Sequence, residues 1–445
     1  DCLAVYKIRH VMMGGFEPKL TRARLVNEIG PEKTSELYKG YQPNHLLVVS
    51  PGQVYSGPYA KGETVFKEMS QHIVGLTEPD SGSNSWVLDG SRTKSGLPLI
   101  GGDPHRGLDV PNVYYQNHIA CDEFDVIGMS FPGCPGFPHF GHNKNVAWCV
   151  THAMSDYQDL YIEKFNPNDT SQYEYEGKWL NAQISPDTIK VRDSHDRSIE
   201  LVSTIHGPII SGRPADGKAI AIKYTALEPD NKNAQSIRSM LSVENVDQMD
   251  ASMKDWVDPC NNFVFADIQG SIRYLNRGKV PIRPEQNVWL PVPGWTGEGE
   301  WDGYVKHENL PRIVNPEAGF IVTANQKIVD ENYPHLLSLD YAPGYRAQVI
   351  HDLLKDMQNA ELKDMTEIHA ACRSIPAGVY CALLKNVDSP SERFDEIKNL
   401  LIEWDGSMNK DSIEPTIYSA MRITLNKKLV EHNLGDISES AIDAA

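Results

Sequence analysis

Four polar segments of the chain contain side chains that could take part in catalysis. A serine hydroxyl can act as a nucleophile beside a base, an imidazole can move a proton, and a side-chain amide can donate to a developing oxyanion. The segments are Gly82-Ser83-Asn84-Ser85-Trp86, Gly101-Gly102-Asp103-Pro104-His105, Gly141-His142-Asn143 and Asn261-Asn262. Taken alone, each is also typical of an ordinary turn or strand entry.

The familiar motifs of other enzyme classes are missing from the sequence. The segment Gly128-Met129-Ser130-Phe131-Pro132 fails the G-x-S-x-G pattern at its last position, and there is no Walker A, H-E-x-x-H or Rossmann sequence. Asp156 and Asp159 could supply oxygen ligands to a hard cation such as Ca²⁺, although acids at this spacing are usually solvated loop residues.

The elements that must position these residues change along the chain. Residues 16–75 are predicted to be mostly helical, with a break at Gly30-Pro31. From Ser85 to about Gly303 short β-type runs dominate, interrupted by one helical stretch over residues 234–256, and helices return after Tyr345. The clearest predicted strands are 85–88, 145–150, 219–224 and 263–266. A strand-rich middle flanked by helices predicts an α+β layered architecture.

Composition excludes several classes of function. The 445 residues contain 42 Lys and Arg against 60 Asp and Glu, a net charge of −18, which disfavours nucleic acid or an anionic membrane surface as the main partner. No apolar run approaches the roughly 18 residues of a membrane span. Because neither end carries a visible targeting signal, we expect the chain to be an internal piece of a longer protein.

Taken together and in order, these segments and several others resemble the penicillin acylase family of N-terminal-nucleophile hydrolases, which includes acyl-homoserine lactone acylases. The resemblance covers nearly the whole chain. Its blocks are residues 82–87, 102–105, 141–143, 147–148, 156–161, 206–208, 262–267, 290–295 and 321–325.

The resemblance implies an αββα sandwich made as one precursor that cuts itself between Gly82 and Ser83. Residues 1–57 would be the C-terminal part of the small subunit, 58–82 the spacer, and 83–445 the N-terminal part of the large subunit. The mature protein would be a heterodimer of its own cleaved chains, in the periplasm or secreted. Glycine before the serine suits the open turn that an N→O acyl shift needs.

The resemblance also implies roles for individual residues. Ser83 would be the nucleophile and its own α-amino group, with an ordinary pKa of about 7.7–8.0, the base. The side chain of Asn262 and the backbone N–H of His152 would form the oxyanion hole. His105 would orient the terminal amine, and Arg283 would support the asparagine.

By the same resemblance, Asp156, Asp159 and the carbonyl of Gln158 would bind a structural Ca²⁺, although the family's glutamate ligand would fall upstream of Asp1. The substrate would be a small N-acyl amine, such as a β-lactam antibiotic or an acyl-homoserine lactone. Phe137, Phe140 and Trp86 are candidates to line an apolar acyl pocket, although each could equally be core.

Two alternatives remain open from the residues alone. The chain could be a non-catalytic β protein that binds small ligands, or an inactive homologue. It could also be a metal hydrolase, whose candidate ligands would be Asp103, His105, His142 and His206.

Overall fold

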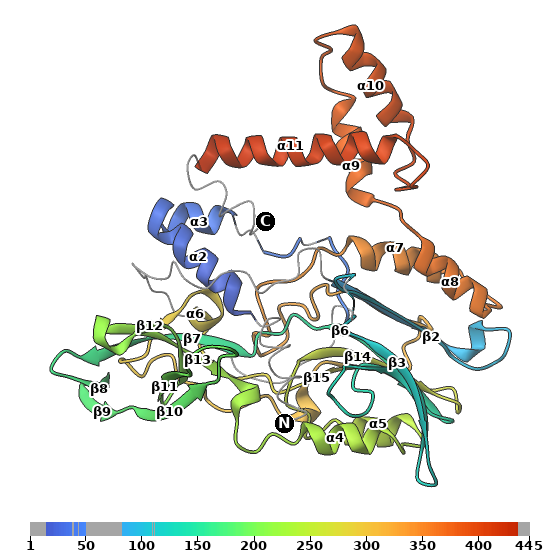
Figure 1. The fold of residues 1–445 in the computed structure, drawn as a ribbon. Helices are drawn as coiled ribbons and strands as arrows, with labels where there is room; N and C mark the ends of the chain where they lie inside the picture. The colour runs from blue at the N-terminus through green and yellow to red at the C-terminus, as the bar shows by residue number, and fades with distance from the viewer. Residues whose placement is uncertain are drawn as a thin grey trace.

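The computed structural model describes residues 15–37, 40–42, 44–49, 82–108, 110 and 112–434. Two stacked β-sheets, each covered by helices on its outer face, form the centre of the molecule (Figure 1). The predicted spacer, residues 58–82, lies outside the described residues except for Gly82, and so does the predicted helical stretch around residues 64–74.

The smaller central sheet contains the strand that begins with the candidate nucleophile. Its order is β18 (Phe320–Thr323), β1 (Gly82–Leu88) and β2 (Leu99–His105), and both neighbours run antiparallel to β1. Side chains alternate across β1: Ser85 and Val87 point to the second sheet, whereas Trp86 and Leu88 pack against helices. Ser83 therefore lies on the face between the sheets.

The larger central sheet packs against the inner face of β1 and β2. Contacts of β6 with β1 and β2, and of β14 with β1, join the two sheets. Every residue of β14 is buried because the strand is covered on both faces. The order of the larger sheet is β17 (Arg312–Val314), β15 (Ile272–Arg277), β14 (Asn261–Asp267), β6 (Val146–His152), β5 (Phe140–His142), β4 (Asp125–Ser130) and β3 (Tyr115–Ala120).

Helices complete the sandwich. On the outer face of the smaller sheet lie α7 (Tyr345–Leu354) and α8 (Leu362–Ala370), and beneath the larger sheet lie α4 (Asn233–Met240) and α5 (Val246–Ser252) (Figure 1). The Asn245 side chain caps α5 by accepting from the Gln248 N–H, which splits the single helix predicted over residues 234–256. The predicted αββα layering is confirmed.

A third sheet extends sideways from this core (Figure 1). Its order is β10 (Gln183–Ile189), β11 (Arg197–Thr204), β12 (Gly207–Arg213), β13 (Lys218–Tyr224), β7 (Gln158–Asn166), β8 (Asp169–Tyr175) and β9 (Lys178–Asn181), with β16 (Val292–Pro293) parallel to β7. The strand β7 follows β6 after five residues, so this sheet is anchored directly beside the central one.

The remaining helices lie at the edges. The amphipathic stretch predicted at the N-terminal end forms α2 (Phe16–Ile29) and α3 (Pro31–Leu37), separated at Gly30, and α2 packs against β7 and α6 (Glu285–Trp289). Figure 1 shows α9 (Ile375–Leu384), α10 (Glu392–Glu403) and α11 (Glu414–Leu434) projecting away from the sheets. Short 3₁₀ turns are η1 (Gly90–Arg92), η2 (Pro214–Asp216), η3 (Thr225–Leu227) and η4 (His307–Asn309).

Candidate active site

The candidate nucleophile lies at the beginning of β1 and is almost fully buried. Ser83 is 7% exposed, and its Oγ lies 3.4 Å from the backbone nitrogen of His152, whose N–H points toward it. His152 is the last residue of β6, so this contact joins the two central sheets. One of the two backbone or amide donors implied by the resemblance is therefore beside the serine.

Asn325, just beyond β18, contacts Ser83 with both ends of its side-chain amide. Its Oδ1 accepts the Ser83 N–H at 2.8 Å, and its Nδ2 donates to Ser83 Oγ at 3.2 Å and to the His152 carbonyl at 2.8 Å. The register explains the placement, because Ser85 pairs with Thr323 and Asn325 follows two residues later. The φ of Asn325 is +64°, a left-handed value that asparagine tolerates better than most residues.

Arg346 of α7 donates hydrogen bonds to both Ser83 and Asn325. Its Nη1 donates to the carbonyl of Ser83 at 2.8 Å and its Nη2 to Oδ1 of Asn325 at 3.0 Å. A cation on Oδ1 leaves Nδ2 as the end of the amide that faces Ser83 Oγ. The guanidinium therefore fixes which way the amide points.

His105 lies across the strand pair from Gly82, its register partner. Its Nε2 lies 3.1 Å from Oδ2 of Asp103, and this hydrogen bond lowers the pKa of the Asp103 carboxyl. Asn84 donates to the same carboxylate oxygen at 3.1 Å. His105 is thus beside the predicted scissile bond, while the Ser83 nitrogen itself is held by Asn325.

The His152 imidazole is half-buried, and desolvation together with the nearby charge of Arg106 lowers its pKa to about 4. The ring is therefore neutral at working pH. Its Nδ1 accepts the Met154 N–H at 3.3 Å, and its Nε2 lies 3.3 Å from the Tyr157 hydroxyl. The side chain is occupied within its own loop, and only the backbone N–H of His152 is directed at Ser83.

Asn262 lies in β14, paired with Thr151 of β6 rather than with the serine. Its Nδ2 donates to the Thr151 hydroxyl at 2.9 Å and its Oδ1 accepts from the Tyr274 hydroxyl at 2.8 Å. The amide that reaches Ser83 Oγ is that of Asn325. The structure therefore places the amide of Asn325, and not that of Asn262, beside Ser83 Oγ.

Arg283 also lies elsewhere than expected. Its Nε is 2.8 Å from Asp159 and its Nη2 is 3.2 Å from Asp156, so it faces the two acids proposed as calcium ligands. The arginine that contacts both Ser83 and the supporting asparagine is Arg346. Arg346, rather than Arg283, is therefore the arginine beside the serine.

Comparison with known proteins identifies the family. The family model described as penicillin amidase matches residues 1–445. The chain belongs to the penicillin amidase family. It is 39% identical to the penicillin acylase 2 proenzyme of Pseudomonas sp. (strain SE83), over 78% of this chain and 45% of that protein. It is 25% identical to the acyl-homoserine lactone acylase QuiP of Pseudomonas fluorescens (strain Pf0-1), over 79% of this chain and 45% of that protein.

A solved structure shows the same fold. The thermostable penicillin G acylase from Alcaligenes faecalis superposes with a TM-score of 0.69 at 22% identity, covering 80% of this chain and 66% of that one. The chain spans less than half the length of the two sequence relatives named above. The substrates given in the relatives' names are therefore those of the relatives.

For this member of the penicillin amidase family, the sequence analysis gave no role to Asn325 or Arg346, which the structure places in contact with Ser83. The block containing Asn325 was recognised as part of the resemblance, but its asparagine was given no role. The available signal was an asparagine beside a β-type run: Asn325 follows the run that begins at Ile321, and Asn261-Asn262 precede the run over 263–266. Only the pairing of β18 with β1 distinguishes the two asparagines.

The residues proposed for an acyl pocket divide between two faces. Trp86 points away from Ser83 and donates its Nε1 to the sulfur of Met365 in α8, so it cannot line a pocket on the Ser83 face. Phe137 and Phe140 are buried in the core between the sheets, where a side chain at Gly102 would meet the Phe140 ring. Of the three candidates, these two are on the side that faces the larger sheet.

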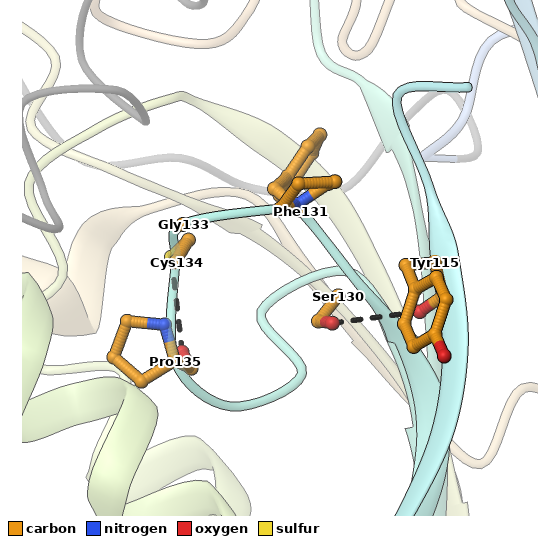
Figure 2. A pocket seen from close by; sticks show the side chains of 7 residues that line it. Tyr115, Ser130, Phe131, Gly133, Cys134 and Pro135 are labelled. Carbon is orange, nitrogen blue, oxygen red and sulfur yellow. Dashed lines mark hydrogen bonds between the residues drawn. The ribbon is translucent and has the colours of Figure 1, made fainter. Parts of the chain in front are cut away.

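A hollow of about 440 Å³ lies at the β3–β4 edge of the larger sheet and is lined by Tyr115 and residues 130–135 (Figure 2). Ser130 donates to the Tyr115 carbonyl at 3.4 Å within it. Its strands lie two and three places along the sheet from β6, which carries His152. The hollow is therefore separate from the contacts that surround Ser83.

The candidate ligands of a metal hydrolase lie in different parts of the fold. Asp103 and His105 are in β2, His142 is in β5, and His206 is in the β11–β12 turn of the third sheet, with Glu163 and Glu300 on its two ring nitrogens. Within the described part of the chain, no three His, Cys, Asp or Glu side chains are grouped so as to hold a metal ion. In the same residues, no helix is both long and apolar enough to cross a membrane.

Proposed function

We propose that this protein hydrolyses small N-acyl amines through an acyl-enzyme on Ser83, after cutting itself between Gly82 and Ser83. One observation carries the proposal: Asn325 engages both the nitrogen and the hydroxyl of Ser83, and the His152 N–H is directed at the same hydroxyl. A serine of purely structural importance has no need of donors on Oγ from two further segments.

The proposed self-cleavage needs no second molecule other than water. Ser83 Oγ attacks the Gly82 carbonyl carbon, the C–N bond to Ser83 breaks, and the nitrogen takes up a proton to become a free amine. Water then hydrolyses the resulting ester, which releases Gly82 as a carboxylate and restores the hydroxyl. His105 and Arg346 flank Gly82, since an added Cβ there would lie 3.2 Å from a nitrogen of each.

The freed amine then serves as the base for external substrates. It accepts the proton of Ser83 Oγ as the oxygen attacks the substrate carbonyl, and it returns a proton to the leaving amine. The attacked carbon becomes bonded to Ser83 Oγ, so the negative oxygen that it carries lies close to that atom. Asn325 Nδ2 and the His152 N–H, which both lie at Ser83 Oγ, would stabilise this oxygen. Water then attacks the acyl carbon and gives a proton to the amine, the C–O bond to Ser83 breaks, and the amine returns the proton to Oγ as the acid is released.

The mature protein would be a heterodimer of its cleaved chains, and we propose export to the periplasm or the medium from the family resemblance. The relatives' names support N-acyl amines such as penicillins or acyl-homoserine lactones as the substrate class.

Two measurements test the proposal. N-terminal sequencing of the large fragment should read Ser-Asn-Ser-Trp, and hydrolysis of an acyl-chain series by the cleaved protein should give release of the amine. Ser83→Ala should abolish both events, whereas Ser83→Cys should retain cleavage because a thiol still performs the acyl shift. An intact wild-type chain without hydrolytic activity would favour an inactive, ligand-binding homologue.

A further inference from the structure

A buried lysine occupies the place where the family resemblance implies a calcium ion. Lys19 of α2 is 0% exposed, and its Nζ lies 2.7 Å from Asp156 Oδ2, 2.6 Å from Asp159 Oδ1 and 2.5 Å from the Gln158 carbonyl oxygen. These are the three groups expected to bind Ca²⁺. A lysine ammonium has three hydrogens to donate, so the three oxygens satisfy it fully.

The oxygens of Asp159 are already engaged by protein donors. Oδ1 accepts from Lys19, and Oδ2 lies 2.8 Å from Arg283 Nε, 2.6 Å from Trp301 Nε1 and 3.2 Å from Asn287 Nδ2. The carboxylate is therefore charged and paired without a metal.

Asp156 is engaged in the same way. Its Oδ2 contacts Lys19 at 2.7 Å and Arg283 at 3.2 Å, while Oδ1 accepts the Gln158 N–H at 3.2 Å. The cluster thus has two buried carboxylates and two buried cations, and its formal charge is zero. A calcium ion prefers 6–8 oxygen ligands with an excess of negative charge, and these residues do not fit that requirement.

We propose that the Lys19 ammonium replaces the structural cation in this protein, so that α2 is joined to β7 by a built-in ion pair and the fold does not depend on calcium. The ammonium supplies one positive charge at the oxygens, and Arg283 supplies the second. A covalently attached side chain would thus take the place of an ion that chelators can remove.

The replacement has a further consequence that rests on the proposed self-cleavage. Lys19 precedes the Gly82–Ser83 bond, and Asp156 and Asp159 follow it. Once that bond is cut, the cluster links the two chains of the heterodimer. The cluster itself does not depend on cleavage, so the test below also holds for an intact chain.

The test measures calcium binding and thermal unfolding of the wild-type protein. We expect no calorimetric binding signal with millimolar Ca²⁺, and a melting temperature unchanged by Ca²⁺ or by EDTA. Stoichiometric binding, or a melting temperature that falls on chelation, would overturn the proposal. This measurement decides the question even if a Lys19 variant does not fold.

The variant Lys19→Ala supplies the second arm. Removing one partner from a buried cluster should lower the melting temperature by roughly 3–5 °C, and Ca²⁺ should restore part of that loss. The matched control is Arg22→Ala, which removes another buried cation of α2, 2.7 Å from Asp340. It should be destabilised without responding to Ca²⁺. A Lys19→Ala variant that melts like wild type, or that ignores Ca²⁺, would contradict the replacement.

Discussion

Asn325 contacts both functional groups of Ser83, with Oδ1 2.8 Å from its nitrogen and Nδ2 3.2 Å from its hydroxyl oxygen. The two residues are far apart in the sequence and meet because β18 pairs with β1. Since Arg346 donates to Oδ1, the amide has one favourable orientation. Under the proposed function, one side chain would therefore both hold the amine and stabilise an oxyanion.

Asn325→Ala is expected to lower kcat by about 10²–10³, the usual cost of losing one oxyanion donor. Asn262→Ala should instead act on folding, because it leaves the buried hydroxyls of Thr151 and Tyr274 without their amide partner. Turnover and melting temperature measured for both cleaved variants separate the two roles. If Asn262→Ala lost turnover and Asn325→Ala did not, the proposal that Asn325 is the oxyanion donor would be refuted.

Arg346→Lys should reduce kcat more than it changes KM. A lysine keeps the positive charge but cannot contact the Ser83 carbonyl and Asn325 Oδ1 together, so the amide loses its fixed orientation. We expect a loss of roughly tenfold, about 1.4 kcal/mol of transition-state stabilisation. Arg283→Lys is the matched control and should leave kcat close to wild type. Equal losses in the two variants would count against a role for Arg346 at the serine.

His152→Ala should retain activity within a few-fold, because the backbone N–H that points at Ser83 remains. The imidazole has a pKa lowered to about 4 by burial and by Arg106, so it does not change charge between pH 5 and 9. The rise of kcat/KM with pH should therefore reflect the α-amino group, near about 7.7–8.0 when unperturbed. A rising limb that shifts in His152→Ala would assign the base to the imidazole.

His206 should make the folded state less stable as the pH rises. Burial lowers the pKa of His206, but hydrogen bonds and charge from Glu163 and Glu300 together raise it by more than burial lowers it. The folded pKa therefore lies above the ordinary value. Its stabilisation is thus complete below the unfolded pKa, about 6.5, and is lost as the pH rises through the folded pKa. Urea midpoints from pH 6 to 9 should fall more steeply for wild type than for His206→Gln. Parallel profiles would contradict this.

The sequence predicted the layers better than the contacts between them. The β-type runs predicted over 85–88 and 263–266 are local signals, and both lie within observed strands, β1 and β14. Asp103-Pro104-His105, also typical of a turn, is instead the end of β2, because pairing with β1 keeps it extended. Local propensity did not contain that information.

The difference between the expected and the observed neighbours of Ser83 has a physical cause. Asn262 and Asn325 each adjoin a β-type run, and Arg283 and Arg346 each lie about twenty residues beyond one of them. Spacing alone could not choose between these pairs, since the choice depends on which strand borders β1. Lys19 was missed for a different reason, because a lysine on an amphipathic helix ordinarily belongs to its solvated face.

The central position of β1 in its sheet affects the entropy of the proposed catalytic amine. A newly cut chain end ordinarily frays and samples many orientations. Here the end would be Ser83, whose strand is bordered by β2 on one side and β18 on the other. The ladder already restricts the backbone before the peptide bond is broken, so the amine would appear in a single place with little freedom left to lose. Folding would thus accomplish the ordering that substrate binding would otherwise have to supply.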